Sequence, residues 1–248
     1  MKREWHEVTV ARRVAWSADL ISVVFDADIG PFRAGQFIDV ALEPGGAGTS
    51  RSYSLASAPE QPPELFVSLV AGGELTPRLF SAPVGASVWL RWPAAGVFTL
   101  ERLPDARHLW LLATGTGLAP YLSMLRTEQP WQRFERIVVA HGVRSAQGLA
   151  YRDELSAHAA RHPGRLSVVP VVSRDPGAAG VLHGRITTAW DSGELEARAG
   201  LAMRVEDAQV MLCGNPRMVD EMRLRLEAAG YSRNSPRSPG QFTYEAYW

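Results

Sequence analysis

The hydrophobic pattern of this chain changes its period once, near residue 100, and that change limits the folds open to it. Before that point, short segments in which apolar and polar residues alternate are separated by turns rich in glycine and proline. Closely spaced segments of this kind are typical of an antiparallel barrel or sandwich. The predicted strands cover 8–14, 20–25, 37–42, 51–55, 65–70 and 87–92, with a short helix at 76–81.

After residue 104, near-continuous apolar runs alternate with helical stretches. Strands that are apolar on both faces and separated by helices indicate a parallel sheet covered on both sides. The predicted strands are 109–113, 137–140, 166–172 and 210–212, and the predicted helices are 119–126, 152–161, 186–191 and 216–228. We therefore predict two domains, an antiparallel β-barrel over 1–100 followed by a Rossmann-like α/β domain with a parallel sheet over 101–248.

Composition excludes several classes of partner and cofactor. The 26 basic residues balance the 26 acidic ones, so the bulk charge gives no reason to expect nucleic acid as a partner. Cys213 is the single cysteine, which excludes an intrachain disulfide, a four-cysteine zinc site and a protein-held iron–sulfur cluster. His158 and His162 lie four residues apart, but their polar neighbours indicate a solvated helix face. We expect no metal site.

The apolar segments of the chain are all short. The first residues lack the apolar core of a signal peptide, and no run reaches the roughly 18 to 20 apolar residues that a membrane-spanning helix needs. We therefore expect a cytoplasmic protein without a membrane partner, and we expect it to be a monomer.

The segment Arg51-Ser52-Tyr53-Ser54-Leu55 combines a cation, an aromatic ring and hydroxyl groups on one predicted strand. Side chains alternate between the two faces of an extended chain, so Arg51 and Tyr53 point one way and the two serines the other. A strand end of this kind can offer a guanidinium to phosphate and a ring to a flavin. An ordinary edge strand with a buried tyrosine would contain the same residues, so the segment alone leaves both interpretations open.

Two glycine turns follow strands of the second domain. The first, around Gly115, Thr116 and Gly117, leads into a helix, and such a turn lets backbone N–H groups and the helix N-terminus receive a pyrophosphate. The second contains Cys213 and Gly214. In the strand order 3-2-1-4-5 the first and fourth strands are neighbours, so both turns would open into one crevice. A small buried filler at a strand end is the alternative role for Cys213.

Three arginines follow strands on the side where the adenosine end of a dinucleotide should lie. They are Arg144, Arg174 and Arg185. A site for NAD typically presents a carboxylate to the ribose 2′-hydroxyl, whereas a site for NADP presents cations to the 2′-phosphate. Because no acidic residue follows Arg144 until Asp153, the pattern favours NADP(H).

With these three motifs in this order, the chain resembles the ferredoxin–NADP reductase family from end to end. The aromatic tail 242–248 resembles the bacterial branch of that family, typified by the enterobacterial flavodoxin/ferredoxin–NADP reductase, whose chain also ends in Tyr-Trp. The resemblance implies non-covalently bound FAD, NADP(H) as the nucleotide, and ferredoxin or flavodoxin as the partner.

The resemblance also implies roles for individual residues. Arg51 and Ser52 would bind FAD, Tyr53 would stack on its ring system, and Ser54 would hydrogen-bond near the flavin N5. Cys213 and Gly214 would lie against the nicotinamide, with Ser54, Cys213 and Glu245 around the reacting centre. The FAD pyrophosphate would meet Gly73, Glu74, Leu75 and Thr76, the NADP pyrophosphate would meet Gly115, Thr116 and Gly117, and Tyr247 and Trp248 would cover the flavin or the adenine.

Two other functions share parts of this pattern. A reductase component that serves an oxygenase or another dedicated redox partner would run the same chemistry with a different acceptor. A flavin- or nucleotide-binding module without turnover would keep the binding residues only. In that case NADPH would not bleach a bound flavin.

Overall fold

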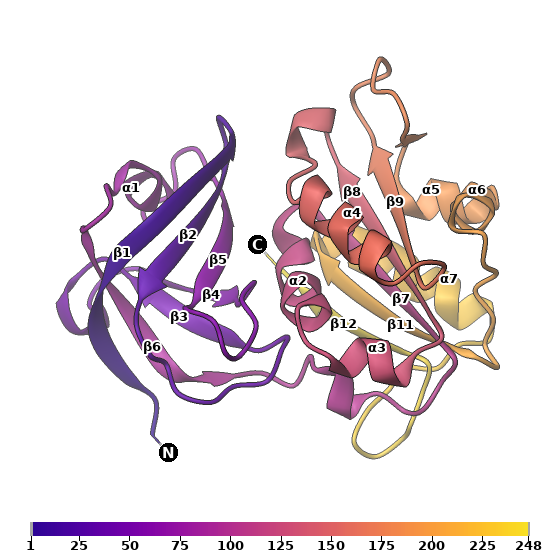
Figure 1. Cartoon of the computed structure of the whole chain (residues 1–248), viewed down its shortest axis with the longest axis horizontal. Helices are drawn as coiled ribbons and strands as arrows, with labels where there is room; N and C mark the ends of the chain where they lie inside the picture. The colour runs from indigo at the N-terminus through magenta and orange to yellow at the C-terminus, as the bar shows by residue number, and fades with distance from the viewer. Residues whose placement is uncertain (1, 248) are drawn as a thin grey trace. The chain divides into compact units, whose positions relative to one another are not determined.

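The computed structural model describes residues 2–247, and by its internal contacts the chain divides into two compact units. The first contains the residues up to Leu100 together with Ala119–Thr127. The second contains Glu101–Leu118 and the residues from Glu128 onward. Each unit has its own sheet, and Figure 1 labels most of the elements of both.

The first unit is built on one antiparallel sheet with the strand order β4-β3-β6-β1-β2-β5. Its interior is apolar because alternate strand residues such as Val23, Phe25, Ile38 and Leu90 turn inward and are fully buried. Its elements are β1 (Glu4–Ser17), β2 (Leu20–Asp26), β3 (Phe37–Ala41), η1 (Pro44–Gly46), β4 (Ser50–Ser54), β5 (Glu64–Ser68), α1 (Thr76–Ser81), β6 (Ser87–Ala95) and η2 (Leu100–Arg102, which begins at the last residue of this unit).

The two edge strands of this sheet, β4 and β5, meet just after β4 ends. Leu55 forms a bridge with Leu65, and the Ala56 N–H donates to the Glu64 carbonyl at 2.8 Å. This meeting closes the sheet into the predicted barrel, since closure removes exposed edges.

Helix α2 (Ala119–Leu125) packs at this closure point. Each of its seven residues is buried. The Ser123 hydroxyl donates to the Ser57 carbonyl at 2.6 Å, and Arg126 Nη1 donates to the Ala56 carbonyl at 2.9 Å and to Glu64 Oε2 at 2.7 Å. The helix therefore anchors residues 56 and 57, which follow β4.

The second unit contains a parallel sheet with the order β10-β9-β8-β7-β11-β12. The four predicted strands follow the usual doubly wound order 3-2-1-4, with β7 and β11 side by side, while β10 adds a strand beyond β9 and β12 adds one beyond β11. Its strands are β7 (His108–Thr114), β8 (Arg136–Val143), β9 (Leu166–Val172), β10 (Leu182–His183), β11 (Ala208–Gly214) and β12 (Phe242–Ala246). The helices are η3 (Gly115–Leu118), α3 (Gln129–Arg133), η4 (Ala146–Gly148), α4 (Arg152–Arg161), α5 (Ile186–Asp191), α6 (Glu194–Ala199) and α7 (Pro216–Ala228).

Both faces of the parallel sheet are covered, as its apolar strands require. Trp110 and Leu112 of β7 pack on one face with residues of α5, α6 and α7. The alternating neighbours Leu109 and Leu111 are fully buried on the other face. Among residues 2–247, no helix combines the length and the apolar character needed to cross a membrane.

Candidate functional site

The strand β4 holds the first group of predicted residues. Arg51 and Ser52 are exposed, Tyr53 is half-buried against the barrel core, and Ser54 is buried. The Ser52 hydroxyl donates to Asp39 Oδ1 on the paired strand β3 at 2.6 Å. Burial raises the pKa of Tyr53 to about 12, against the opposing charge of Arg51, so the ring is neutral over the physiological range.

The segment 73–76 lies beside the start of β4. The Thr49 hydroxyl, one residue before the strand, donates to the Glu74 carboxylate. The hydroxyl of Thr76 accepts the Val70 N–H at 2.9 Å, and the Gly73 N–H donates to the Val70 carbonyl at 2.9 Å. Internal bonds of the turn thus engage the Gly73 N–H and the Thr76 hydroxyl, while the Glu74 side chain faces Thr49.

The two glycine turns of the second unit pack directly against each other. A Cβ on Gly117 would lie 2.4 Å from the Cys213 carbonyl oxygen, and a Cβ on Gly214 would lie 2.5 Å from the Thr114 carbonyl oxygen. Gly214 also has φ +124°, a conformation that favours glycine. The Asn215 N–H donates to Thr114 Oγ1 at 2.7 Å, which ties the second turn to the end of β7.

His141 supports the first glycine turn, and the sequence did not single it out. Its Nε2 lies 3.0 Å from the carbonyl oxygen of Gly115, a residue with φ +54°. Burial lowers the pKa of His141 to about 4, so the ring is neutral and Nε2 carries the proton that it donates. The detectable signal was a histidine at the end of the apolar run of β8.

The neutral state of His141 predicts a pH-dependent stability. The unfolded chain binds a proton at this histidine below about pH 6.5 and the folded chain only near pH 4, so stability is lost as the pH falls through that window. We expect the contribution to approach about 3 kcal/mol. Urea unfolding of the wild type and of His141→Asn between pH 7 and 4 measures it. If the free energy of unfolding falls equally with pH in both proteins, His141 is not the source of the pH dependence.

The C-terminal strand brings three further predicted residues together. Cys213 of β11 pairs with Glu245 of β12, and the Tyr247 N–H donates to the Gly214 carbonyl at 2.8 Å. Burial raises the pKa of the Cys213 thiol well above its usual range, partly offset by a hydrogen bond with Tyr247 and reinforced by the charge of Glu245. The thiol is therefore protonated and is a poor nucleophile. Trp248 lies outside the described residues.

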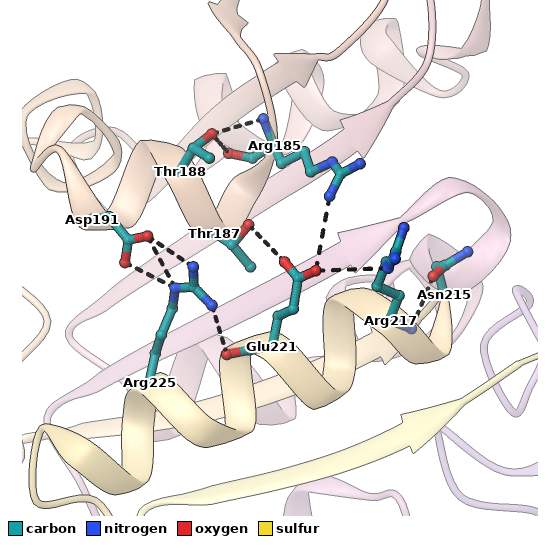
Figure 2. Close-up of polar contacts among 8 residues, drawn as sticks. All are labelled: Arg185, Thr187, Thr188, Asp191, Asn215, Arg217, Glu221 and Arg225. Atoms are coloured by element: carbon teal, nitrogen blue, oxygen red, sulfur yellow. Dashed lines mark hydrogen bonds and ion pairs between the residues drawn. The ribbon is translucent and has the colours of Figure 1, made fainter.

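The three predicted arginines lie on successive loops at the carboxyl ends of β8, β9 and β10. The Arg174 N–H donates to the Arg144 carbonyl at 2.7 Å, and the Gly184 N–H donates to the Val172 carbonyl at 2.8 Å. The side chains of Arg144, Arg174 and Arg185 are exposed. Arg185 differs from the other two because its guanidinium faces Glu221 on α7 (Figure 2), with Nη1 at 3.8 Å from Oε1.

The structure thus gathers the predicted residues into one group in each unit. In the first unit, the segments 51–54 and 73–76 are joined through Thr49. In the second unit, the two glycine turns, Glu245 and Tyr247 share one end of the sheet with the three arginine loops. Among the residues from 2 to 247, no three His, Cys, Asp or Glu side chains are grouped to hold a metal ion.

Comparison with known proteins gives matches in both sequence and structure. Residues 111–223 match a family model described as the oxidoreductase NAD-binding domain. Over 247 residues, the chain is 40% identical to a flavodoxin/ferredoxin–NADP reductase of Shigella flexneri, and the alignment covers 99% of each chain. A protein of the same name from Escherichia coli K12 is 39% identical with the same coverage.

A solved structure is similar over the same extent. It is the crystal structure of a ferredoxin NADP⁺ reductase from Neisseria gonorrhoeae with bound FAD and NADP. Its TM-score is 0.91, its sequence is 29% identical, and the match covers 98% of both chains.

Proposed function

Because the chain belongs to the flavodoxin/ferredoxin–NADP reductase family, we propose that it is an FAD-dependent enzyme that exchanges electrons between NADP(H) and ferredoxin or flavodoxin. One observation in the structure carries this proposal. Gly117 packs against the Cys213–Gly214 turn so closely that no side chain fits, and this leaves two backbone turns side by side at the carboxyl end of a parallel sheet. That is where α/β sheets bind dinucleotides.

The first unit fits FAD. Tyr53 supplies a neutral ring, half-buried against the barrel, next to the exposed guanidinium of Arg51. An aromatic face suits a flat ring system, and a guanidinium suits phosphate oxygens. The segment 73–76 is linked to the start of the same strand through the Thr49 hydroxyl and the Glu74 carboxylate, and we assign this segment to the FAD pyrophosphate. We assign FAD to the domain of residues 1–100, with Ser52 and Ser54 as further contacts.

The second unit fits NADP(H), and we assign the nucleotide to the domain of residues 101–248. The turn of Gly115, Thr116 and Gly117 allows close backbone approach to a pyrophosphate. His141 holds the carbonyl of Gly115 and so fixes the direction of that turn. The exposed arginines Arg144, Arg174 and Arg185 are assigned to the 2′-phosphate.

The remaining assigned residues surround the place of reaction. The chemistry that bound FAD supplies is the conversion of a two-electron exchange with NADPH into single-electron exchange with a carrier protein. Cys213 is a buried, protonated thiol, and we assign it together with Gly214 to the side of the site that faces the nicotinamide. Glu245 pairs with Cys213 across the two strands, and the Tyr247 hydroxyl lies 3.4 Å from Glu245 Oε2. We assign Trp248 with Tyr247 to covering a bound ring.

Anaerobic reduction tests the proposal. The FAD-loaded protein is mixed with NADPH or with NADH, and then with purified ferredoxin or flavodoxin. We expect NADPH to bleach the flavin much faster than NADH at equal concentration, and the reduced protein to pass electrons to at least one carrier. Bleaching without transfer to either carrier would favour a dedicated oxygenase or similar partner. A flavin that NADPH does not bleach would indicate a binding module without turnover.

A further inference from the structure

A cluster of charged side chains connects α5 to the first turns of α7 (Figure 2). Glu221 Oε1 lies 3.8 Å from Arg185 Nη1 and 3.8 Å from Arg217 Nε, and Glu221 Oε2 accepts the Thr187 hydroxyl at 3.4 Å. Arg217 and Glu221 are one turn apart on α7, whereas Arg185 comes from the loop before α5. One carboxylate is therefore shared by two arginines.

The contacts of Glu221 with the arginines are weak. At 3.8 Å they are too long for hydrogen bonds, and the side chains of Arg185 and Arg217 are 58% and 77% exposed. Solvent screens exposed ion pairs of this kind. A more highly charged anion can therefore replace the Glu221 carboxylate at Arg185 at a small cost in free energy.

A different ion pair fastens α7 to α5. Arg225 reaches both carboxylate oxygens of Asp191, with distances of 2.9 and 3.0 Å from Nε and 2.9 Å from Nη2 (Figure 2). This is the bidentate geometry that gives a pair both strength and direction. Because Asp191 and Arg225 hold the two helices together, the loose contacts of Glu221 are not needed for that purpose.

We infer that Glu221 is an internal counter-anion for Arg185 and thereby a positioning residue that sets how strongly the site distinguishes a 2′-phosphorylated nucleotide from an unphosphorylated one. The inference rests on the proposed function, which assigns Arg185 to the 2′-phosphate. Without nucleotide, Glu221 occupies Arg185. When a 2′-phosphate takes Arg185, Arg217 and Thr187 retain the released carboxylate.

Two opposite effects follow from this exchange. Glu221 weakens the binding of a phosphate at Arg185, because it competes for the guanidinium and repels a second anion. Arg217 strengthens that binding indirectly, because it neutralises the same carboxylate. Removing Glu221 and removing Arg217 should therefore shift affinity in opposite directions.

The experiment measures equilibrium binding to the FAD-loaded protein by calorimetry, with adenosine 2′,5′-bisphosphate and 5′-AMP as probes that differ only in the 2′-phosphate. We expect Glu221→Gln to bind the bisphosphate about two- to fivefold more tightly, in the range of exposed ion pairs. We expect Arg217→Gln to bind it more weakly by a similar factor. The affinity for 5′-AMP should change far less in both variants, and both effects should shrink as salt is added.

A double variant and a matched pair complete the design. If Arg217 acts through Glu221, Arg217→Gln has no further effect once Glu221→Gln is present. Arg223 and Glu227 form an ion pair one turn apart on the same helix, at 3.1 Å, so Glu227→Gln and Arg223→Gln make the same charge changes away from Arg185. We expect these two controls to bind both probes as the wild type does.

Several outcomes would overturn the inference. Unchanged or weaker bisphosphate binding by Glu221→Gln shows that the carboxylate does not compete for Arg185. If Arg217→Gln lowers the affinity for the bisphosphate in a protein that already contains Glu221→Gln, Arg217 contacts the phosphate itself. Equal effects of Glu227→Gln show a general charge effect. If the wild type itself does not distinguish the two probes, the proposed NADP(H) specificity fails instead.

Discussion

Replacement of both Arg144 and Arg174 by alanine is expected to raise the KM for NADPH by more than about a hundredfold and to change the KM for NADH only slightly. Hydrogen bonds to charged groups contribute about 1.5 to 3 kcal/mol each, and about 1.4 kcal/mol corresponds to a tenfold change. The backbone hydrogen bond from Arg174 to Arg144 holds the two residues side by side and both side chains are exposed, so we expect both guanidinium groups to contact one phosphate.

Steady-state kinetics with each nucleotide and a chemical electron acceptor measures this effect. Arg204→Ala is the matched control, because Arg204 is also an exposed arginine of the second unit but follows no strand of the parallel sheet. We expect the control to keep the wild-type preference for NADPH. If the KM values for NADPH and for NADH rise by the same factor in the double variant, the arginines do not recognise the 2′-phosphate.

Arg126→Ala is expected to lower the free energy of unfolding by about 3 to 5 kcal/mol, since removing one partner leaves a buried charge uncompensated. The side chains of Arg126 and Glu64 are only 13% and 10% exposed, and their atoms Nη1 and Oε2 are 2.7 Å apart. Arg126 also donates to the Ala56 carbonyl, so the variant loses a bond at the point where β4 and β5 close the barrel.

Urea unfolding measures this loss of stability. FAD is kept at the same excess for every variant, because a ligand that binds only the folded state adds to its stability. Arg107→Ala is the control, since Arg107 and Glu135 form an ion pair at 2.7 Å with both side chains more than half exposed, and such pairs contribute at most about 1 kcal/mol. The double variant Arg126→Met, Glu64→Leu should recover much of the stability. A loss below about 1 kcal/mol for Arg126→Ala would show that water compensates the Glu64 carboxylate.

The elements that the sequence predicted share a clear physical basis. The alternation at Val8 and Val10, which are buried between exposed neighbours, and apolar runs such as 109–113 follow from which faces of a strand are buried, and this is a local property of the chain. Glycine turns can also be predicted from the sequence. Gly214, for example, has a backbone conformation and a close approach to Thr114 that other residues cannot adopt.

The elements that were missed lack such a local signal. The strand β10 has two residues and the helix α3 has five, too few to establish a period. The helix α6 was also missed, although it has six residues like the predicted helices α1 and α5. The strand β12 lies in the aromatic tail, whose predicted role was to cover a bound ring. It pairs with β11 through contacts between residues that are some 30 positions apart.

Local patterns in the sequence account for the two kinds of sheet and for the glycine turns, because periodicity and turn chemistry act between near neighbours. Tertiary contacts decide which groups support these elements. His141 reaches Gly115 across the sheet, Arg126 reaches Glu64, and Glu221 lies between Arg185 and Arg217. These partners depend on strand register and helix packing, which bring together side chains that no local pattern connects.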